Sequence, residues 1–126
     1  MAVYFLNVGI DMVEIERIKK SMNRKSFLNV ILGKDEYEQL RNRNFPVQSV
    51  AANFCAKEAF SKAIGTGIRG FGFKDVQLLR SELGKPYLLI SENIINKLGI
   101  SGFKFDVSIT HTKNYAAAVV VCDKER

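Results

Sequence analysis

The sequence has few residues of the kinds that build disulfide frameworks, zinc sites or membrane spans. It holds two cysteines, Cys55 and Cys122, and one histidine. The two cysteines form no Cys-x-x-Cys pair, so we expect no zinc site but two reduced, buried thiols in a cytoplasmic protein. The apolar run Ala2 to Leu6 is far shorter than the ~20 residues that a membrane span needs. No basic segment precedes this run, which argues against a secretory signal, and we expect no membrane partner.

Linkers, low-complexity segments and internal repeats are also missing from the sequence. The length is 126 residues, of which 47% are hydrophobic and 25% are charged. This length suits one domain with one core, and the chain is too apolar for intrinsic disorder. We therefore expect a single domain over residues 1–126.

Acidic residues are the scarcer charged class. There are 13 acidic against 19 basic residues, which gives a net charge of +6 and favours an anionic partner. Nucleic acid, anionic membrane, a phosphorylated ligand and an acidic protein all fit this charge. Residues 17–25 hold five of the basic residues and no acidic one. This segment is either a solvated helix face or a docking face for an acidic partner, with Met22 and Phe27 as apolar anchors.

Hydrophobic periodicity predicts mostly helices in the first half of the chain and strands in the second. Strands are expected over residues 3–10, 73–79, 86–90, 105–110 and 115–121. Helices are expected over residues 11–22, 26–32, 35–43, 46–64 and 91–98. This order favours an α+β fold with a helix layer packed on a mostly antiparallel sheet. Both faces of the last strand are apolar and should be covered, which makes self-association a hypothesis.

The helix predicted over residues 46–64 carries charges on a largely apolar surface. Apolar residues cover most of its circumference at ~100° per residue. Yet Glu58 and Lys62 lie four residues apart on one face. A surface ion pair would explain them without any function. Alternatively, the carboxylate ligates a hard cation and the amine binds phosphate, as in a metal–phosphate site.

Asp11 and His111 also allow two interpretations each. Asp11 is a candidate helix N-cap that forms a capping box with Glu14. It also follows the first predicted strand, where its carboxylate could join Glu58 as a second magnesium ligand. His111 ends the strand predicted over residues 105–110, and a lone histidine can be structural or functional.

Gly65, Gly67 and Gly70 spell a GxGxxG pattern that does not indicate a dinucleotide-binding site. The pattern follows a helix and precedes a strand, whereas the fingerprint follows a strand and opens a helix. We interpret Gly65 as the helix end. Thr66 and Gly67 then belong to a loop whose backbone could approach a phosphate.

Three blocks of the sequence resemble the bacterial holo-[acyl-carrier-protein] synthases, which are small 4′-phosphopantetheinyl transferases. They are GIDMVEIERI at residues 9–18, FCAKEAFSKAIGTGI at 54–68 and SITHTKNYAAAVVV at 108–121. GKPY at residues 84–87 is a fourth, weaker match. The resemblance implies the α+β fold of those transferases. It also implies transfer of the phosphopantetheine arm from coenzyme A to a serine of apo acyl carrier protein in fatty acid biosynthesis, releasing adenosine 3′,5′-bisphosphate.

The resemblance also implies roles for residues that match the blocks. Asp11, Glu58 and Lys62 would be catalytic, with Asp11 and Glu58 as magnesium ligands and Lys62 assisting the leaving group. The residues implied to bind coenzyme A are Lys62, Gly65, Thr66, Gly67, Lys85, Pro86 and His111. The residues implied to receive the acidic carrier protein are Arg17, Met22, Arg24 and Phe27. Lys57 lies in the central block and is also expected to meet the coenzyme A phosphates.

The resemblance further implies a homotrimer with active sites between subunits, so that Asp11 and Glu58 can come from one chain and His111 from another. Asn53 departs from the family, which often has arginine there. If that arginine binds nucleotide phosphates, another residue must supply the contact here. A non-enzymatic nucleic-acid-binding module is the alternative that the basic charge and nine phenylalanines allow. No RNP-like or helix-turn-helix signal supports it, so we expect no nucleic-acid partner.

Overall fold

The computed structural model describes residues 6–65 and 72–124. The elements in chain order are β1 (Leu6–Glu14), α1 (Ile15–Ser21), α2 (Phe27–Ile31), α3 (Lys34–Arg41), α4 (Val47–Ile64), the 3₁₀ helix η1 (Phe73–Asp75), β2 (Val76–Arg80), β3 (Pro86–Ile90), α5 (Glu92–Leu98), β4 (Lys104–His111) and β5 (Tyr115–Asp123). Apart from the N-terminal segment and η1, these elements match the predicted types closely. Among the described helices, none has the length and apolar character that crossing a membrane requires.

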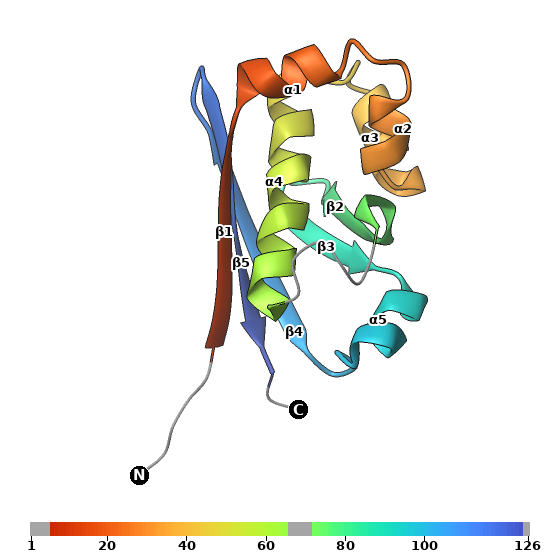
Figure 1. The fold of residues 1–126 in the computed structure, drawn as a ribbon, viewed down its shortest axis with the longest axis vertical. Helices are drawn as coiled ribbons and strands as arrows, with labels where there is room; N and C mark the ends of the chain where they lie inside the picture. The colour runs from red at the N-terminus through yellow and green to blue at the C-terminus, as the bar shows by residue number, and fades with distance from the viewer. Residues whose placement is uncertain (1–5, 66–71, 125–126) are drawn as a thin grey trace.

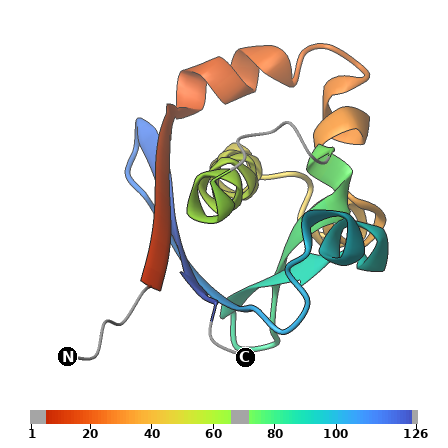
Figure 2. The same ribbon diagram turned by 60° about the horizontal axis from the view of Figure 1, so that its bottom comes forward.

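The strands form two antiparallel sheets, one in the order β1-β5-β4 and the other a β2-β3 hairpin. Helix α4 runs along the three-stranded sheet (Figure 1). Viewed nearly along its axis, α4 is enclosed by that sheet on one side and by β2 and β3 on the other (Figure 2). The predicted α+β fold, with helices packed on antiparallel sheet, is confirmed.

Helix α4 packs closely against the sheet because small residues face each other across the interface. Gly9 of β1 is buried, and a Cβ there would clash with the Ala59 carbonyl oxygen and lie 2.6 Å from the Ala63 nitrogen. Gly65 ends the helix in the left-handed conformation, with φ of 83°. The close approach at Gly9 fixes β1, and with it Asp11, against the flank of α4.

The start of the chain differs from the prediction. β1 extends to Glu14 because β5 offers it a pairing partner along its whole length, with Asp11 opposite Ala118 and Glu14 opposite Tyr115. Helix α1 therefore begins at Ile15, and the interpretation of Asp11 as a helix N-cap with a capping box is wrong. Asp11 lies inside the strand, on the side that faces α4.

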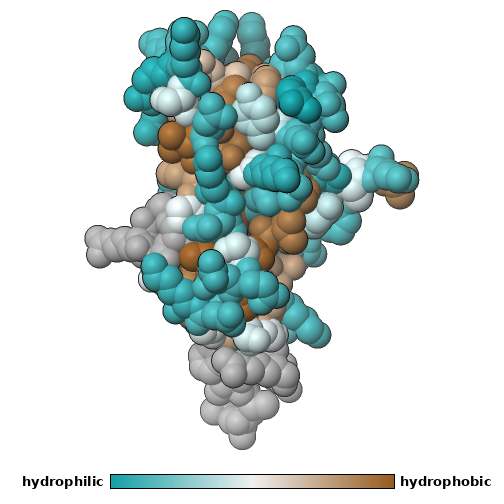
Figure 3. Space-filling view, turned by 90° about the vertical axis from the view of Figure 1, so that its right-hand side faces the viewer, coloured by the Kyte–Doolittle hydropathy of each residue, from teal (hydrophilic) through white to brown (hydrophobic). Residues whose placement is uncertain are grey.

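One face of the three-stranded sheet is apolar and uncovered within the described chain. Leu6, Val8, Ile10 and Met12 of β1 are each 62–66% exposed, and Tyr115 of β5 is 45% exposed. The opposite side of the molecule has mainly hydrophilic residues, with apolar ones between them (Figure 3). The sequence predicted that both faces of the last strand would be covered. Within the described chain, the face of β5 toward α4 is covered and the other face is not. We call the outer surface of β1 and β5 the open sheet face.

Candidate active site

The structure brings Asp11, Glu58 and Lys62 together. Asp11 comes from the middle of β1, and Glu58 and Lys62 come from successive turns of α4. The Lys62 Nζ donates hydrogen bonds to Asp11 Oδ1 at 3.2 Å and to the Ile10 carbonyl oxygen at 3.0 Å. We call these three residues the carboxylate–lysine cluster. The cluster places two carboxylates and one amine at the edge where β1 meets α4.

The two carboxylates of the cluster influence each other electrostatically. Partial burial and the negative charge of Asp11 raise the pKa of Glu58, while the positive charges of Lys62 and Arg17 oppose this shift. Burial also raises the pKa of the Cys55 thiol to about 12, and the nearby Asp11 and Glu58 charges add to this effect. Cys55 is therefore an unreactive thiol beneath the cluster. Two carboxylates that repel each other are suited to share a cation.

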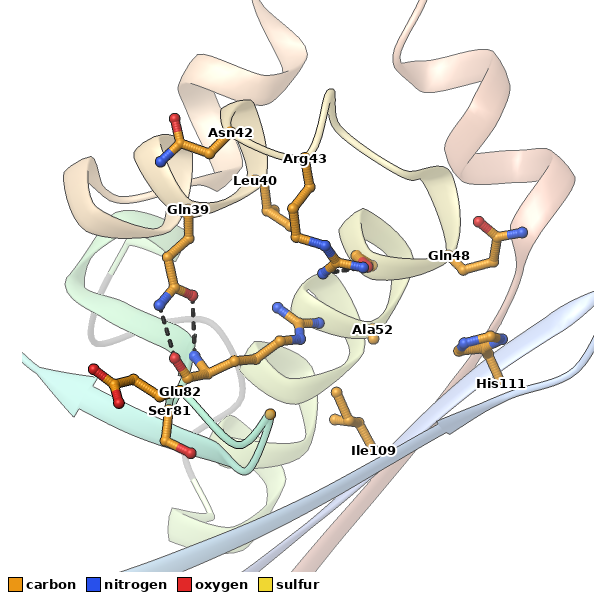
Figure 4. A pocket seen from close by; sticks show the side chains of 13 residues that line it. Gln39, Leu40, Asn42, Arg43, Gln48, Ala52, Ser81, Glu82, Ile109 and His111 are labelled. Carbon is orange, nitrogen blue, oxygen red and sulfur yellow. Dashed lines mark hydrogen bonds between the residues drawn. The ribbon is translucent and has the colours of Figure 1, made fainter.

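A cavity of about 520 Å³ lies along another part of α4, where Gln48, Ser49 and Ala52 contribute to its wall. His111 faces it from the end of β4, and Arg43 from the turn after α3 (Figure 4). Arg80, at the end of β2, also lines it. We call it the arginine–histidine cavity. Its described lining includes none of the carboxylate–lysine cluster, because β1 and β4 lie on opposite sides of β5.

The remaining residues expected to bind coenzyme A lie in several places. Gly84 lines the arginine–histidine cavity, but its neighbours Lys85 and Pro86 are not among the described lining residues. Lys85 instead forms an exposed ion pair with Asp106 at 3.3 Å. Gly65 ends α4 one turn beyond Lys62, and Thr66 and Gly67 lie outside the described residues. Their assignment to the nucleotide pocket stays a prediction.

The residues expected to receive a carrier protein lie on and after α1. Arg17 is exposed on α1, and its charge acts on Glu58, so this part of α1 is close to the carboxylate–lysine cluster. The Arg24 guanidinium lies 5.8 Å from the centre of the Phe27 ring, in a cation–π arrangement. Met22 and Phe27 are half-buried against the core. They keep only part of their apolar surface available to a partner.

Lys57, expected from sequence to meet phosphates, is instead fully buried. Its Nζ donates to Glu36 Oε1 and to the carbonyl oxygens of Phe73 and Val76, at 2.5–2.7 Å. Asn53 donates to Glu36 Oε2 at 2.9 Å and to the Leu78 carbonyl oxygen at 3.1 Å. The expectation for Lys57 is therefore wrong: Lys57, Glu36 and Asn53 join α3, α4 and β2. We call them the buried polar cluster.

Sequence reasoning missed Arg43 and Arg80, which are far apart in the chain. They meet because Gln39 of α3 binds the backbone of Arg80, accepting from its nitrogen at 3.0 Å and donating to its oxygen at 2.8 Å. No spacing of residues along the sequence predicts this contact. The sequence offers one indirect signal. Arg43 follows α3 and Arg80 ends β2, and both of these elements are predicted from their hydrophobic periodicity.

Comparisons with known proteins show the family to which the chain belongs. The model of a family described as the 4′-phosphopantetheinyl transferase superfamily matches residues 7–120. The holo-[acyl-carrier-protein] synthase of Clostridium beijerinckii is 43% identical over 119 residues, which are 94% of this chain and 97% of that protein.

Two solved structures are similar over nearly their whole length. The Helicobacter pylori holo-[acyl-carrier-protein] synthase in complex with coenzyme A has a TM-score of 0.79 and 31% identity, covering 92% of this chain and 99% of that one. The Bacillus anthracis holo-(acyl-carrier-protein) synthase in complex with CoA (3′,5′-ADP) has a TM-score of 0.81 and 31% identity, covering 98% and 100%. The chain therefore belongs to the 4′-phosphopantetheinyl transferase superfamily, within its family of holo-[acyl-carrier-protein] synthases.

Proposed function

We propose that this protein transfers the 4′-phosphopantetheine group from coenzyme A to a serine of apo acyl carrier protein, in fatty acid biosynthesis. The products are holo acyl carrier protein and adenosine 3′,5′-bisphosphate. The observation that carries the proposal is the meeting of Asp11 with Glu58 and Lys62, whose chemistry suits phosphoryl transfer. The names of the relatives and the coenzyme A bound in two similar structures support it.

Magnesium is the cofactor that we propose for this reaction. Asp11 and Glu58 supply carboxylate oxygens, the donors that this hard cation prefers, and their mutual repulsion would be relieved by binding it. The described residues contain no group of three or more acidic, histidine or cysteine side chains that could hold a metal. The two carboxylates would thus leave other coordination positions to water and substrate phosphate. Bound there, magnesium would supply neutralisation of the pyrophosphate charge.

The side chains of the cluster divide the chemistry between them. Glu58 of α4 accepts the proton of the attacking serine hydroxyl and so acts as the general base. Lys62 is 54% exposed and positively charged, so it can reach the phosphate and stabilise the leaving group. Asp11 orients Lys62 through their ion pair. No covalent enzyme intermediate is needed, since the serine attacks the phosphoryl group directly.

The proposed function is tested by incubating the protein with coenzyme A, magnesium and apo acyl carrier protein, followed by intact mass measurement. The expected result is a mass increase of one phosphopantetheine group on the carrier, together with release of adenosine 3′,5′-bisphosphate. If folded enzyme leaves the mass of several different apo carrier proteins unchanged, the proposed phosphopantetheine transfer is refuted.

The segment of residues 17–25 is the surface we propose for docking of the acidic carrier protein. Replacing Arg24 with glutamate is expected to raise the KM for carrier protein about tenfold. The substitution turns the attraction between Arg24 and the acidic carrier surface into repulsion. The KM for coenzyme A should stay unchanged. Steady-state kinetics with each substrate varied separately measure both constants.

The matched control is Lys97→Glu, which makes the same charge change at an exposed position on α5. It should leave both KM values near those of the wild type. A similar rise in the carrier KM for the two variants would show that net charge, rather than this surface, determines carrier binding.

We also propose that the protein is a homotrimer whose active sites lie between subunits. Two observations support this. The open sheet face exposes a row of large apolar side chains that a second copy would cover. The carboxylate–lysine cluster and the arginine–histidine cavity also face different sides of the described chain, so a neighbouring subunit could bring one beside the other. The two buried, free cysteines agree with a cytoplasmic location, which cell fractionation would check.

Val8→Glu places a charge in the middle of the open sheet face, where Val8 is 62% exposed. We expect light scattering to show three chains for the wild type and one for this variant, with activity lost as the assembly dissociates. Leu83→Glu is the control, because Leu83 is 98% exposed away from that face. A wild-type protein that is a fully active monomer would contradict the interfacial site.

A further inference from the structure

Gly9 lies two residues before Asp11 on the face of β1 that packs against α4. It is buried, and a Cβ at this position would clash with the Ala59 carbonyl oxygen and lie 2.6 Å from the Ala63 nitrogen. Both contacts are with helix backbone, so no side chain can move aside to make room. The backbone of Gly9 lies outside the left-handed region, so space rather than conformation requires glycine here. Any larger residue must therefore hold β1 farther from α4.

Gly9 meets the helix beside the carboxylate–lysine cluster. The two helix residues that it contacts directly follow Glu58 and Lys62 in the sequence. On the strand, the Ile10 carbonyl oxygen accepts a hydrogen bond from Lys62 Nζ at 3.0 Å, and Asp11 Oδ1 accepts one from the same atom at 3.2 Å. The contact at Gly9 therefore sets the spacing between β1 and α4 at the turns where the cluster forms.

We infer that Gly9 is a positioning residue, which holds the Asp11 carboxylate at the distance from Glu58 at which the two can share one magnesium ion. This inference rests on the magnesium site of the proposed function. Magnesium tolerates little departure from short oxygen distances and octahedral geometry, so two carboxylates that share it need a narrow range of separations. Asp11 has a short side chain, so the position of β1 largely determines where its oxygens lie.

Gly9→Ala tests this role, because the added methyl group displaces β1 without changing any ionisable side chain. A displacement of Asp11 by ~1 Å should lower kcat about 100-fold. It should also weaken magnesium binding roughly 10- to 100-fold, the usual cost of losing the support around a metal ligand. Calorimetric titration of magnesium, with coenzyme A held in excess, measures this binding without carrier protein or turnover.

Asp11→Glu distinguishes positioning from a general loss of stability. Glutamate is one methylene group longer, so at the wild-type spacing it should overreach and weaken magnesium binding roughly tenfold on its own. Combined with Gly9→Ala, the longer side chain spans the wider gap. The double variant should then bind magnesium about fivefold more tightly than Gly9→Ala alone. A merely structural role for Gly9 predicts losses that add, with no such recovery.

The matched control is Gly33→Ala, the same change at another buried glycine. A Cβ there would lie 2.5 Å from the Gln77 side chain, before the start of α3 and outside the carboxylate–lysine cluster. This variant should bind magnesium as the wild type does. Additive losses in the double variant, or wild-type magnesium binding by Gly9→Ala, would overturn the inference and leave the transferase intact.

Two further outcomes are decisive. If Gly9→Ala does not fold, Asp11→Glu decides alone: weaker magnesium binding supports a fixed spacing, and unchanged binding overturns it. If the wild type modifies no carrier protein, the proposed function fails, and the magnesium titrations still decide the role of Gly9. Transfer by the wild type without magnesium would instead overturn the inference and keep the transferase.

Discussion

Replacing Glu58 with glutamine is expected to lower kcat roughly 100- to 10,000-fold, the usual contribution of a general base. Glutamine keeps the size of the side chain but cannot accept the serine proton. It also removes one of the two carboxylates that would ligate magnesium, so the concentration of magnesium needed for half-maximal activity should rise. Steady-state kinetics with magnesium, coenzyme A and apo carrier protein measure both effects.

The matched control is Glu92→Gln, the same change at an exposed position in the first turn of α5. Both variants should unfold at wild-type temperatures, which separates catalysis from stability. Activity near the wild-type level in Glu58→Gln would refute the assignment of the base.

Part of the carboxylate–lysine cluster could be predicted from sequence, because two of its residues interrupt a local pattern. The charges of Glu58 and Lys62 stand out on a helix that is otherwise apolar around most of its circumference. Asp11 was harder to place, since a carboxylate after a strand resembles a helix cap. Pairing with β5, a contact that joins opposite ends of the chain, decides that it lies within the strand. Local propensity cannot express such a partner.

The arginine–histidine cavity and the buried polar cluster both depend on contacts between distant segments. Glu36 is an acidic residue in the first turn of α3, and it is fully buried because this turn packs against β2 and α4. Lys57 was expected to meet the coenzyme A phosphates beside Glu58, yet one residue along a helix turns a side chain by ~100°. That rotation separates the buried polar cluster, which holds Lys57, from the carboxylate–lysine cluster, which holds Glu58.

This separation predicts that Lys57→Met will reduce stability without reducing catalysis by the folded protein. The substitution leaves the Glu36 carboxylate buried without its cation, so the free energy of unfolding at neutral pH should fall by about 3–5 kcal/mol. Burial already raises the pKa of Glu36, and the charge of Lys57 is what opposes this shift. Without Lys57 the pKa rises further, so the variant should recover stability as the pH falls and Glu36 takes up a proton. Urea unfolding at several pH values measures the loss.

Two further variants separate the buried charge from other effects of the substitution. Adding Glu36→Gln to Lys57→Met removes the unpaired charge while keeping an acceptor for the Leu78 nitrogen, so the double variant should be more stable than Lys57→Met alone. Lys74→Met, at an exposed position in η1, should leave the free energy of unfolding almost unchanged. A contact between Lys57 and substrate phosphate would produce the opposite pattern, in which Lys57→Met raises the KM for coenzyme A and leaves the unfolding curve in place. Its complete burial with Glu36 leads us to expect the loss of stability instead.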